Sequence, residues 1–257
     1  MKKFRLSLFP FLLGITFLSI IIIQVAYKST GQQKEYGKIE NKWPDINLLP
    51  QTEEGDLIRY GRELIVNTST YLGPKGNVAR ITNGMNCQNC HIMAGLKPNG
   101  NSFAAVASTY PRYRDRSGRI ESVEFRINDC LERSLNGSSI DSISKEMKAM
   151  VAYLKWVGKD IKKGEKPVGS GITEIPYLNR AADIRIGKAV FESKCVRCHG
   201  SDGEGVLLVD SSGYMYPPLW GDKSYNVSAG LYRLSRLAAF IKYNMPLDLV
   251  LDTPQLS

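Results

Sequence analysis

Apolar side chains recur at helical spacing in the first half of the 257-residue chain. Residues 56–66 predict a helix from the spacing of Leu57, Tyr60, Leu64 and Ile65. Residues 122–136 predict a second helix, with glutamates at its start and Gly137 just past its end. Residues 142–161 predict a third, whose apolar stripe contains Ile143, Met147, Met150, Val151, Leu154 and Val157. We interpret the methionines of this stripe as core packing.

The second half of the chain repeats this plan in a shorter form. Residues 182–195 predict a helix with apolar positions at Ile184, Ile186, Val190 and Phe191, and residues 231–244 predict another helix. Glycines and prolines between residues 162 and 179 indicate a linker. The pattern therefore predicts a mainly α protein with domains at 56–161 and 182–257, joined by a linker at 162–181.

The N-terminus combines basic residues with a long apolar run. Lys2, Lys3 and Arg5 precede an apolar stretch that ends near Ala26, about long enough to cross a bilayer. We expect residues 1–26 to be a retained membrane anchor, with a cleaved signal peptide as the alternative. Residues 27–55 are polar and predict a spacer. Both alternatives predict a periplasmic or other extracytoplasmic location.

Each predicted domain contains one Cys-x-x-Cys-His motif. The motifs are Cys87–His91 and Cys195–His199, and they use both histidines of the chain. This motif is typical of covalent c-type haem attachment, in which two cysteines form thioethers and the histidine binds iron. A zinc site would need both cysteine pairs to converge, and a thioredoxin-like pair would need a βαβ context. We therefore predict two tandem cytochrome c domains, each wrapped around one covalently bound haem c, behind an N-terminal apolar helix.

The distal ligands of the two irons must come from residues other than histidine. Cys130 is the fifth cysteine, and it is either a small buried side chain or a thiolate ligand beside Arg126 and Arg133. For the second haem we prefer Met245, which lies beside Pro246 after a predicted helix, over Met215. Methionine ligation raises a haem potential, whereas an anionic thiolate should lower it.

Two further features concern charge and the end of the chain. The net charge of +9 indicates a solvated basic surface or attraction of anions, and no nucleic-acid-binding motif accompanies it. A cytochrome c domain normally closes with a helix after its methionine loop, and the residues after Met245 are too few for one. We expect a C-terminally truncated sequence; the alternative is a minimal domain covered by a partner.

Several segments resemble the dihaem thiosulfate dehydrogenase family. In the first domain these are residues 83–91, 110–114, 126–130 and 133–137, and in the second they are residues 216–221 and 238–246. The resemblance covers residues 43–257. The first domain is also similar to the haem subunit of the Sox sulfur-oxidation system, which likewise uses a cysteine haem ligand.

The resemblance implies a function and a ligand set. His91 and Cys130 would bind the iron of a catalytic haem, and His199 and Met245 that of an electron-exit haem. Two thiosulfates would be joined to tetrathionate in a reaction that could also run in reverse, and electrons would pass to a small cytochrome or similar acceptor. Some family members carry a lysine before the methionine; this chain has Asn244 there.

Joining two dianions requires positive charge in the substrate pocket. The candidates are Arg112, Arg114, Arg126 and Arg133, with Lys97, Asn99 and Ser102 as weaker ones. Each arginine has an alternative role as a partner of a haem propionate or as a surface charge. The alternative function is a non-catalytic, membrane-anchored electron carrier, which would gain nothing obvious from a thiolate ligand.

Overall fold

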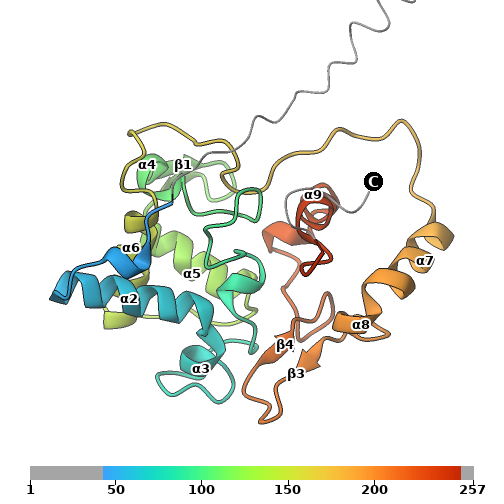
Figure 1. Ribbon diagram of the computed structural model, residues 1–257, viewed down its shortest axis with the longest axis horizontal. Helices are drawn as coiled ribbons and strands as arrows, with labels where there is room; N and C mark the ends of the chain where they lie inside the picture. Colours follow the sequence, from blue (N-terminus) through green and yellow to red (C-terminus); the bar gives the residue numbers. More distant parts are fainter. Residues whose placement is uncertain (1–42, 250–257) are drawn as a thin grey trace, which may run out of the picture. The chain divides into compact units, whose positions relative to one another are not determined.

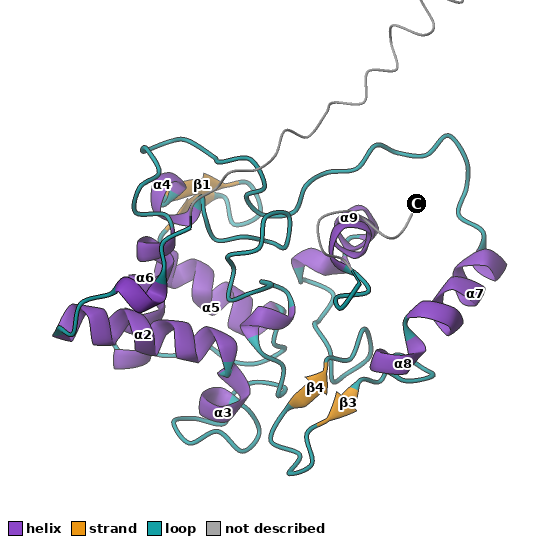
Figure 2. Cartoon of the chain, viewed as in Figure 1, coloured by secondary structure: helices purple, strands orange, loops and turns teal. Residues whose placement is uncertain are grey.

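The computed structural model describes residues 43–249 and is mainly helical (Figures 1 and 2). The first domain contains η1 (Ile46–Leu48), α2 (Glu53–Val66), α3 (Thr68–Leu72), η2 (Cys87–Asn89), α4 (Val106–Thr109), α5 (Val123–Arg133) and α6 (Lys145–Val157). The second contains α7 (Ile184–Lys194), α8 (Val196–His199), η3 (Gly230–Tyr232) and α9 (Leu234–Asn244). All five helices predicted from the apolar pattern are present, with ends shifted by a few residues.

The core of the first domain is built on the crossing of α2 and α6. Thr52 and Ser144 cap the N-termini of these helices by accepting hydrogen bonds from the main-chain amides of Gly55 and Met147. Leu64, Met147 and Met150 are fully buried, as the apolar stripes predict. The helices approach closely at Gly61, where an added Cβ would lie 2.0 Å from the carbonyl oxygen of Ala149.

Two hydrogen bonds reinforce this core at its edges. The hydroxyl of Tyr60 on α2 donates to Oε1 of Glu146 on α6 at 2.9 Å. The hydroxyl of Tyr153, whose ring is fully buried, donates to the carbonyl of Ala94 at 2.9 Å. Because Ala94 lies in the loop after the first Cys-x-x-Cys-His motif, α6 also holds that loop.

Two small hairpins were missed by the apolar pattern. β1 (Arg112–Arg114) pairs antiparallel with β2 (Arg119–Glu121), directly before α5. β3 (Val206–Leu207) pairs with β4 (Tyr214–Tyr216) in the second domain. These strands are too short for alternation to be recognised in a sequence. The first hairpin brings Arg114 close to α5.

The first half of the predicted linker is packed on the first domain. The main chain of Gly171 exchanges hydrogen bonds with that of Ser102, and the amide of Asn99 donates to Gly169. The ammonium of Lys163 donates to the carbonyl of Tyr110 at 2.6 Å. Lys163 of the linker therefore has a structural partner in the first domain.

The second domain has a much smaller buried core. Its buried hydrophobic residues within the described chain are Ala229, Ala239 and Phe240. Helix α7 forms where predicted, capped by Asp183, but none of its residues is buried. Ile184 and Ile186 are 88% and 62% exposed, whereas Phe191 is half-buried and its ring packs against Trp220, so the N-terminal part of the predicted apolar stripe of α7 is exposed in the described structure.

Hydrogen bonds join the second domain to α5 and to the loop that precedes the first motif. The side chain of Asn226 donates to the carbonyl of Glu132, and the main-chain amide of Asn226 donates to the carbonyl of Arg133. The side chain of Asn83 donates to the carbonyls of Lys223 and Ser224. Among residues 43–249, no helix is long and apolar enough to cross a bilayer. The predicted anchor at 1–26 and most of the spacer lie outside the described residues.

Candidate functional site

The first Cys-x-x-Cys-His motif opens into a cavity of about 350 Å³. Its apolar wall includes Phe103, Leu131, Met150 and Leu154, drawn from the loop after the motif, α5 and α6. Cys87, Cys90, His91 and Cys130 all line this same cavity. The structure thus brings together four residues that are separated by up to 43 positions in the chain.

The motif is held in place by short polar contacts. The amide of Cys87 donates to the hydroxyl of Thr68 at 3.0 Å, and the amide of Asn86 donates to the side chain of Asn89 at 2.7 Å. Burial raises the pKa of the Cys87 thiol to about 11 and that of Cys90 to about 12. Both side chains therefore sit in a largely apolar wall of the cavity.

His91 is oriented by a main-chain carbonyl. Its Nδ1 lies 2.6 Å from the carbonyl oxygen of Asn101, which can only accept, so Nδ1 carries the proton. The unprotonated Nε2 lies 3.3 Å from the side-chain amide of Asn101. Burial lowers the pKa of His91 to about 4, which keeps the ring neutral near pH 7. A neutral imidazole oriented in this way is the form that binds metals.

Cys130 reaches the cavity from α5, four residues after Arg126. Residues at i and i+4 share a helix face, so the two side chains are neighbours. Electrostatic interaction with Cys130 is the first of the causes that raise the pKa of Arg126 above its ordinary value. Cys130 also lies close enough to Cys87 and Cys90 to raise their pKa values. All five cysteines are free in the structure.

Several arginines line the cavity. Of the four predicted arginines, Arg114 and Arg126 line it, whereas Arg112 and Arg133 do not. Three cavity arginines were missed by sequence analysis: Arg116 from the loop between β1 and β2, and Arg233 and Arg236 from the second domain. The last two could not be found by motif spacing, because they reach the site only through the packing of the two domains.

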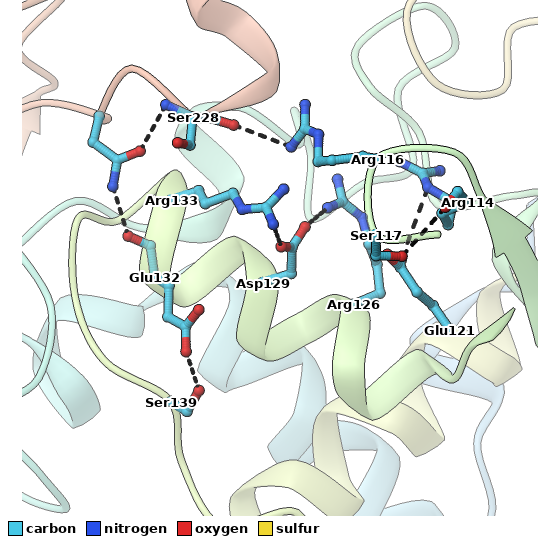
Figure 3. Close-up of polar contacts among 11 residues, drawn as sticks. Arg114, Arg116, Ser117, Glu121, Arg126, Asp129, Glu132, Arg133, Ser139 and Ser228 are labelled. Atoms are coloured by element: carbon cyan, nitrogen blue, oxygen red, sulfur yellow. Dashed lines mark hydrogen bonds and ion pairs between the residues drawn. The ribbon is translucent and has the colours of Figure 1, made fainter. Parts of the chain in front are cut away.

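Asp129 organises two of these arginines (Figure 3). It is buried on α5 and pairs with both Arg126 and Arg133, the latter at 2.5 Å. Nη1 of Arg133 is one of two buried side-chain nitrogen or oxygen atoms in the described chain that have no hydrogen-bond partner. The other is Oε2 of Glu121, which lies 3.8 Å from Nε of Arg114. Two guanidinium groups share one carboxylate here, so positive charge is in excess.

Arg116 extends the cluster towards the second domain (Figure 3). Its Nη1 donates to the carbonyl of Ser228 at 3.0 Å, an acceptor without net charge. Burial, and then the charges of Arg133 and Arg233, lower the pKa of Arg116. The guanidinium groups of Arg116, Arg133 and Arg233 therefore lie close enough to repel one another. An anion bound among them would be stabilised because it relieves this repulsion.

The weaker sequence candidates divide into two kinds. Ser102 lines the cavity, whereas Lys97 and Asn99 do not. The ammonium of Lys97 donates to Oδ1 of Asn244 at 3.1 Å, and the carbonyl of Asn99 accepts from the side chain of Asn244. Lys97 and Asn99 thus contact the second domain instead of the predicted substrate pocket.

The second motif repeats the histidine geometry of the first. Nδ1 of His199 donates to the carbonyl of Pro217 at 2.8 Å, so its Nε2 is also the unprotonated nitrogen. Cys195, Cys198 and His199 are half-buried. Met245 is half-buried at the C-terminal end of α9, whereas the competing Met215 lies on β4 and is 55% exposed.

The residues present fit haem c. At the first site, two thiols, an oriented neutral imidazole and a further thiol line one largely apolar cavity, and arginines for anionic propionates stand at one side. The cavity volume lies within the usual range for small-molecule sites. The second site has the same thiol and imidazole set, with the histidine oriented in the same way.

Comparisons with known proteins agree with this arrangement. Residues 77–162 match the family described as SoxA/TsdA, cytochrome c domain, and residues 184–248 match the cytochrome c family. The chain is 39% identical over 217 residues to the thiosulfate dehydrogenase of Psychrobacter arcticus, covering 84% of this chain and 64% of that protein. It is 36% identical over 208 residues to that of Allochromatium vinosum, covering 79% and 74%.

The chain belongs to the thiosulfate dehydrogenase family. A solved structure, thiosulfate dehydrogenase (TsdBA) from Marichromatium purpuratum in its "as isolated" form, matches with a TM-score of 0.75 and 30% identity. That match covers 84% of this chain and 45% of the other. The chain spans 64% of the length of the Psychrobacter arcticus relative. The predicted pair of cytochrome c domains is thereby confirmed, and two such domains imply two haem c groups.

Proposed function

We propose that this chain oxidises thiosulfate to tetrathionate in the cavity of its first domain. The observation that carries the proposal is the position of Cys130, which lines the same cavity as Cys87, Cys90 and His91. A pure electron carrier has no need of a further thiol beside its haem, or of a cationic pocket there. The names of the relatives supply the substrate class.

His91 and Cys130 would hold the first haem, and Cys87 and Cys90 would attach it. Cys195 and Cys198 would attach the second haem, with His199 and Met245 as ligands. When bound, the two haems supply one-electron acceptors, so the two electrons released when two thiosulfates form one sulfur–sulfur bond leave one at a time. No proton or oxygen is consumed, because two dianions give one dianion and two electrons.

The main task of the protein is to bring two dianions together. Unit charges about 4 Å apart repel by about 4 kcal/mol at an effective dielectric constant of about 20, and each thiosulfate carries two. Arg126 is placed to offset this repulsion, because it shares a helix face with Cys130 and lines the cavity. Fixed guanidinium groups do so without reorganising during the reaction.

The arrangement leaves positive charge for an anion. Asp129 serves Arg126 and Arg133 together, and Arg116 bonds to a carbonyl. The second domain adds Arg233, which has no ion-pair partner within residues 43–249. Propionates of the first haem would take up part of this charge. We assign Arg114 and Arg126 to the substrate pocket, with Arg116 and Arg233 beside them; Arg112 and Arg133 would act from outside the cavity lining.

The site of action would be extracytoplasmic, because haem is attached covalently outside the cytoplasm, and residues 1–26 would anchor or export the chain. Electrons would leave through the second haem to a small cytochrome or a similar acceptor. The same site could run in reverse as a tetrathionate reductase, since the potentials decide the direction. The rival function is an electron carrier with no reaction of its own at the cavity.

The test is steady-state tetrathionate formation by the haem-loaded protein with an artificial one-electron acceptor. Cys130→Gly should abolish tetrathionate formation, whereas Met215→Leu, a control on the exposed strand β4, should leave it unchanged. Both variants must first be shown to contain two haems per chain. Absence of thiosulfate turnover in the fully loaded wild type would favour the electron carrier.

A further inference from the structure

The end of α9 is held by the loop that follows the first haem motif. Asn244, the last residue of α9, is fully buried. Its side-chain amide donates to the carbonyl of Asn99 and to that of Phe240, each at 3.0 Å, and its Oδ1 accepts from Lys97 at 3.1 Å. Three partners therefore fix this side chain, and two of them belong to the first domain.

Lys97 acts as a cap for α9 from the other domain. Its ammonium also lies 3.3 Å from the carbonyl of Tyr243, in the last turn of α9. A cation at this position bonds to a carbonyl of the last helical turn and interacts favourably with the negative end of the helix dipole. Burial lowers the pKa of Lys97, consistent with an ammonium that is partly withdrawn from water. The contact is therefore specific and not a loose surface encounter.

The same loop also orients the first haem ligand. His91 precedes it, and the carbonyl of Asn101 at its far end accepts from Nδ1 of His91. Between them, Gly100 lets the main chain approach Asn244, because a Cβ at this glycine would lie 3.2 Å from Oδ1 of Asn244. One short loop thus touches the imidazole of the first motif and the residue before Met245.

We propose that Lys97 and Asn244 form a latch between the domains that positions Met245 on the second haem. The proposal rests on Met245 being the distal ligand, as proposed above. A thioether is a neutral and weak ligand, so its occupancy depends on how firmly the main chain presents the sulfur. When these hydrogen bonds are formed, the side chain of Asn244 is held in one rotamer at the end of α9. Met245 is the next residue, so its main chain is held in place as well.

The experiment measures how easily imidazole displaces the methionine from the ferric second haem. The readout is loss of the methionine-to-iron charge-transfer absorption, which needs no enzymatic activity. Lys97→Met removes the ammonium but keeps the length of the side chain, and Asn244→Leu removes all three hydrogen bonds. In each, the apparent affinity for imidazole should rise about fivefold or more, which corresponds to about 1 kcal/mol of lost ligand stabilisation.

Two controls make the result interpretable. Lys148→Met alters an exposed lysine on α6 and should leave the imidazole affinity at the wild-type value. Asn244→Asp keeps an acceptor for Lys97 but loses the two donated hydrogen bonds, so we expect an intermediate affinity. Unchanged imidazole affinity in both Lys97→Met and Asn244→Leu, with two haems retained, would overturn the latch.

Failure of the ligand assignment gives a different result. Met245→Ala should abolish the charge-transfer absorption in the untreated protein. If the absorption persists in Met245→Ala, another residue binds the second haem and the proposal falls with its premise. If it disappears there but the latch variants behave as wild type, only the latch is wrong.

Discussion

The two haem-binding domains share a motif and a histidine geometry but differ in how deeply their helices are buried. In the first, α2 crosses α6 and buries Leu64 completely. In the second, α7 occupies the corresponding place before the motif, and Ile186 is 62% exposed. Both histidines nevertheless donate from Nδ1 to a main-chain carbonyl. Orienting the proximal ligand thus depends on a local loop, whereas building a cavity for chemistry depends on the packed core around it.

The two domains also contribute unequally to the cavity. Its wall comes largely from the loop after the first motif, α5 and α6 of the first domain, and the second domain adds Arg233 and Arg236 together with uncharged residues such as Leu231. This arrangement suits a division of labour in which the first domain reacts with substrate and the second passes electrons on.

The largest contrast should appear between matched core substitutions in α2 and α7. Leu64→Ala should lower the free energy of unfolding by about 2–5 kcal/mol, because the side chain is fully buried against α6. Ile186→Ala should change it by less than about 0.5 kcal/mol. Denaturant unfolding of the haem-loaded protein measures both. Equal losses in the two variants would show that the apolar face of α7 is buried in solution.

The next effect concerns charge at the cavity. Arg126→Gln should lower kcat/KM for thiosulfate about 10- to 100-fold, because a charge-assisted contact to a dianion is worth about 1.5–3 kcal/mol. Arg236→Gln is the matched control at another arginine of the cavity lining, which pairs with Glu174 at 3.0 Å, and it should cost about threefold or less. A fall in haem content without a change in kcat/KM per haem would instead assign Arg126 to a propionate.

Gly61 in α2 and Gly187 in α7 should respond to substitution in opposite directions. Gly61→Ala should destabilise the protein by about 1–3 kcal/mol, since its Cβ would meet the main chain of Ala149. Gly187→Ala in α7 has open space around it within the described chain and should stabilise the helix by about 0.5–1 kcal/mol. Thermal unfolding followed by circular dichroism distinguishes the signs. Destabilisation by Gly187→Ala would indicate a partner packed on α7.

The smallest effect concerns the hydrogen bond between α2 and α6. Burial, followed by the hydrogen bond to Glu146, raises the pKa of Tyr60 to about 12 from an ordinary value near 10. The folded state therefore holds this proton more tightly, so the stabilisation is complete below about pH 10 and is lost as the pH rises towards 12.

Tyr60→Phe should cost about 0.5–1.5 kcal/mol at pH 7 and remove this part of the alkaline dependence. Unfolding curves at pH 7 and at alkaline pH, compared with the wild type, measure both quantities. An identical pH dependence in the variant would contradict the assigned role of Tyr60.

Sequence analysis predicted the helices and both motifs because periodicity and short motifs are local signals. It placed Cys130 within a predicted helix, flanked by Arg126 and Arg133, for the same reason. It missed Arg116, Arg233 and Arg236, which reach the cavity through a short hairpin and through the packing of the second domain. It offered Lys97 as a weaker candidate for the substrate pocket and did not foresee the hydrogen bond from Lys97 to Asn244, since residues 147 positions apart carry no joint signal in one sequence.

The most direct test of the central claim is anaerobic rapid mixing of thiosulfate with the oxidised protein, with both haems followed by absorbance. In the wild-type protein, thiosulfate should reduce both haems. In Met245→Ala, thiosulfate should still reduce the first haem. In Cys130→Gly, thiosulfate should reduce neither haem, although dithionite should reduce both haems. Reduction of Cys130→Gly by thiosulfate at the wild-type rate would contradict the assignment of the reaction to the cavity of the first domain.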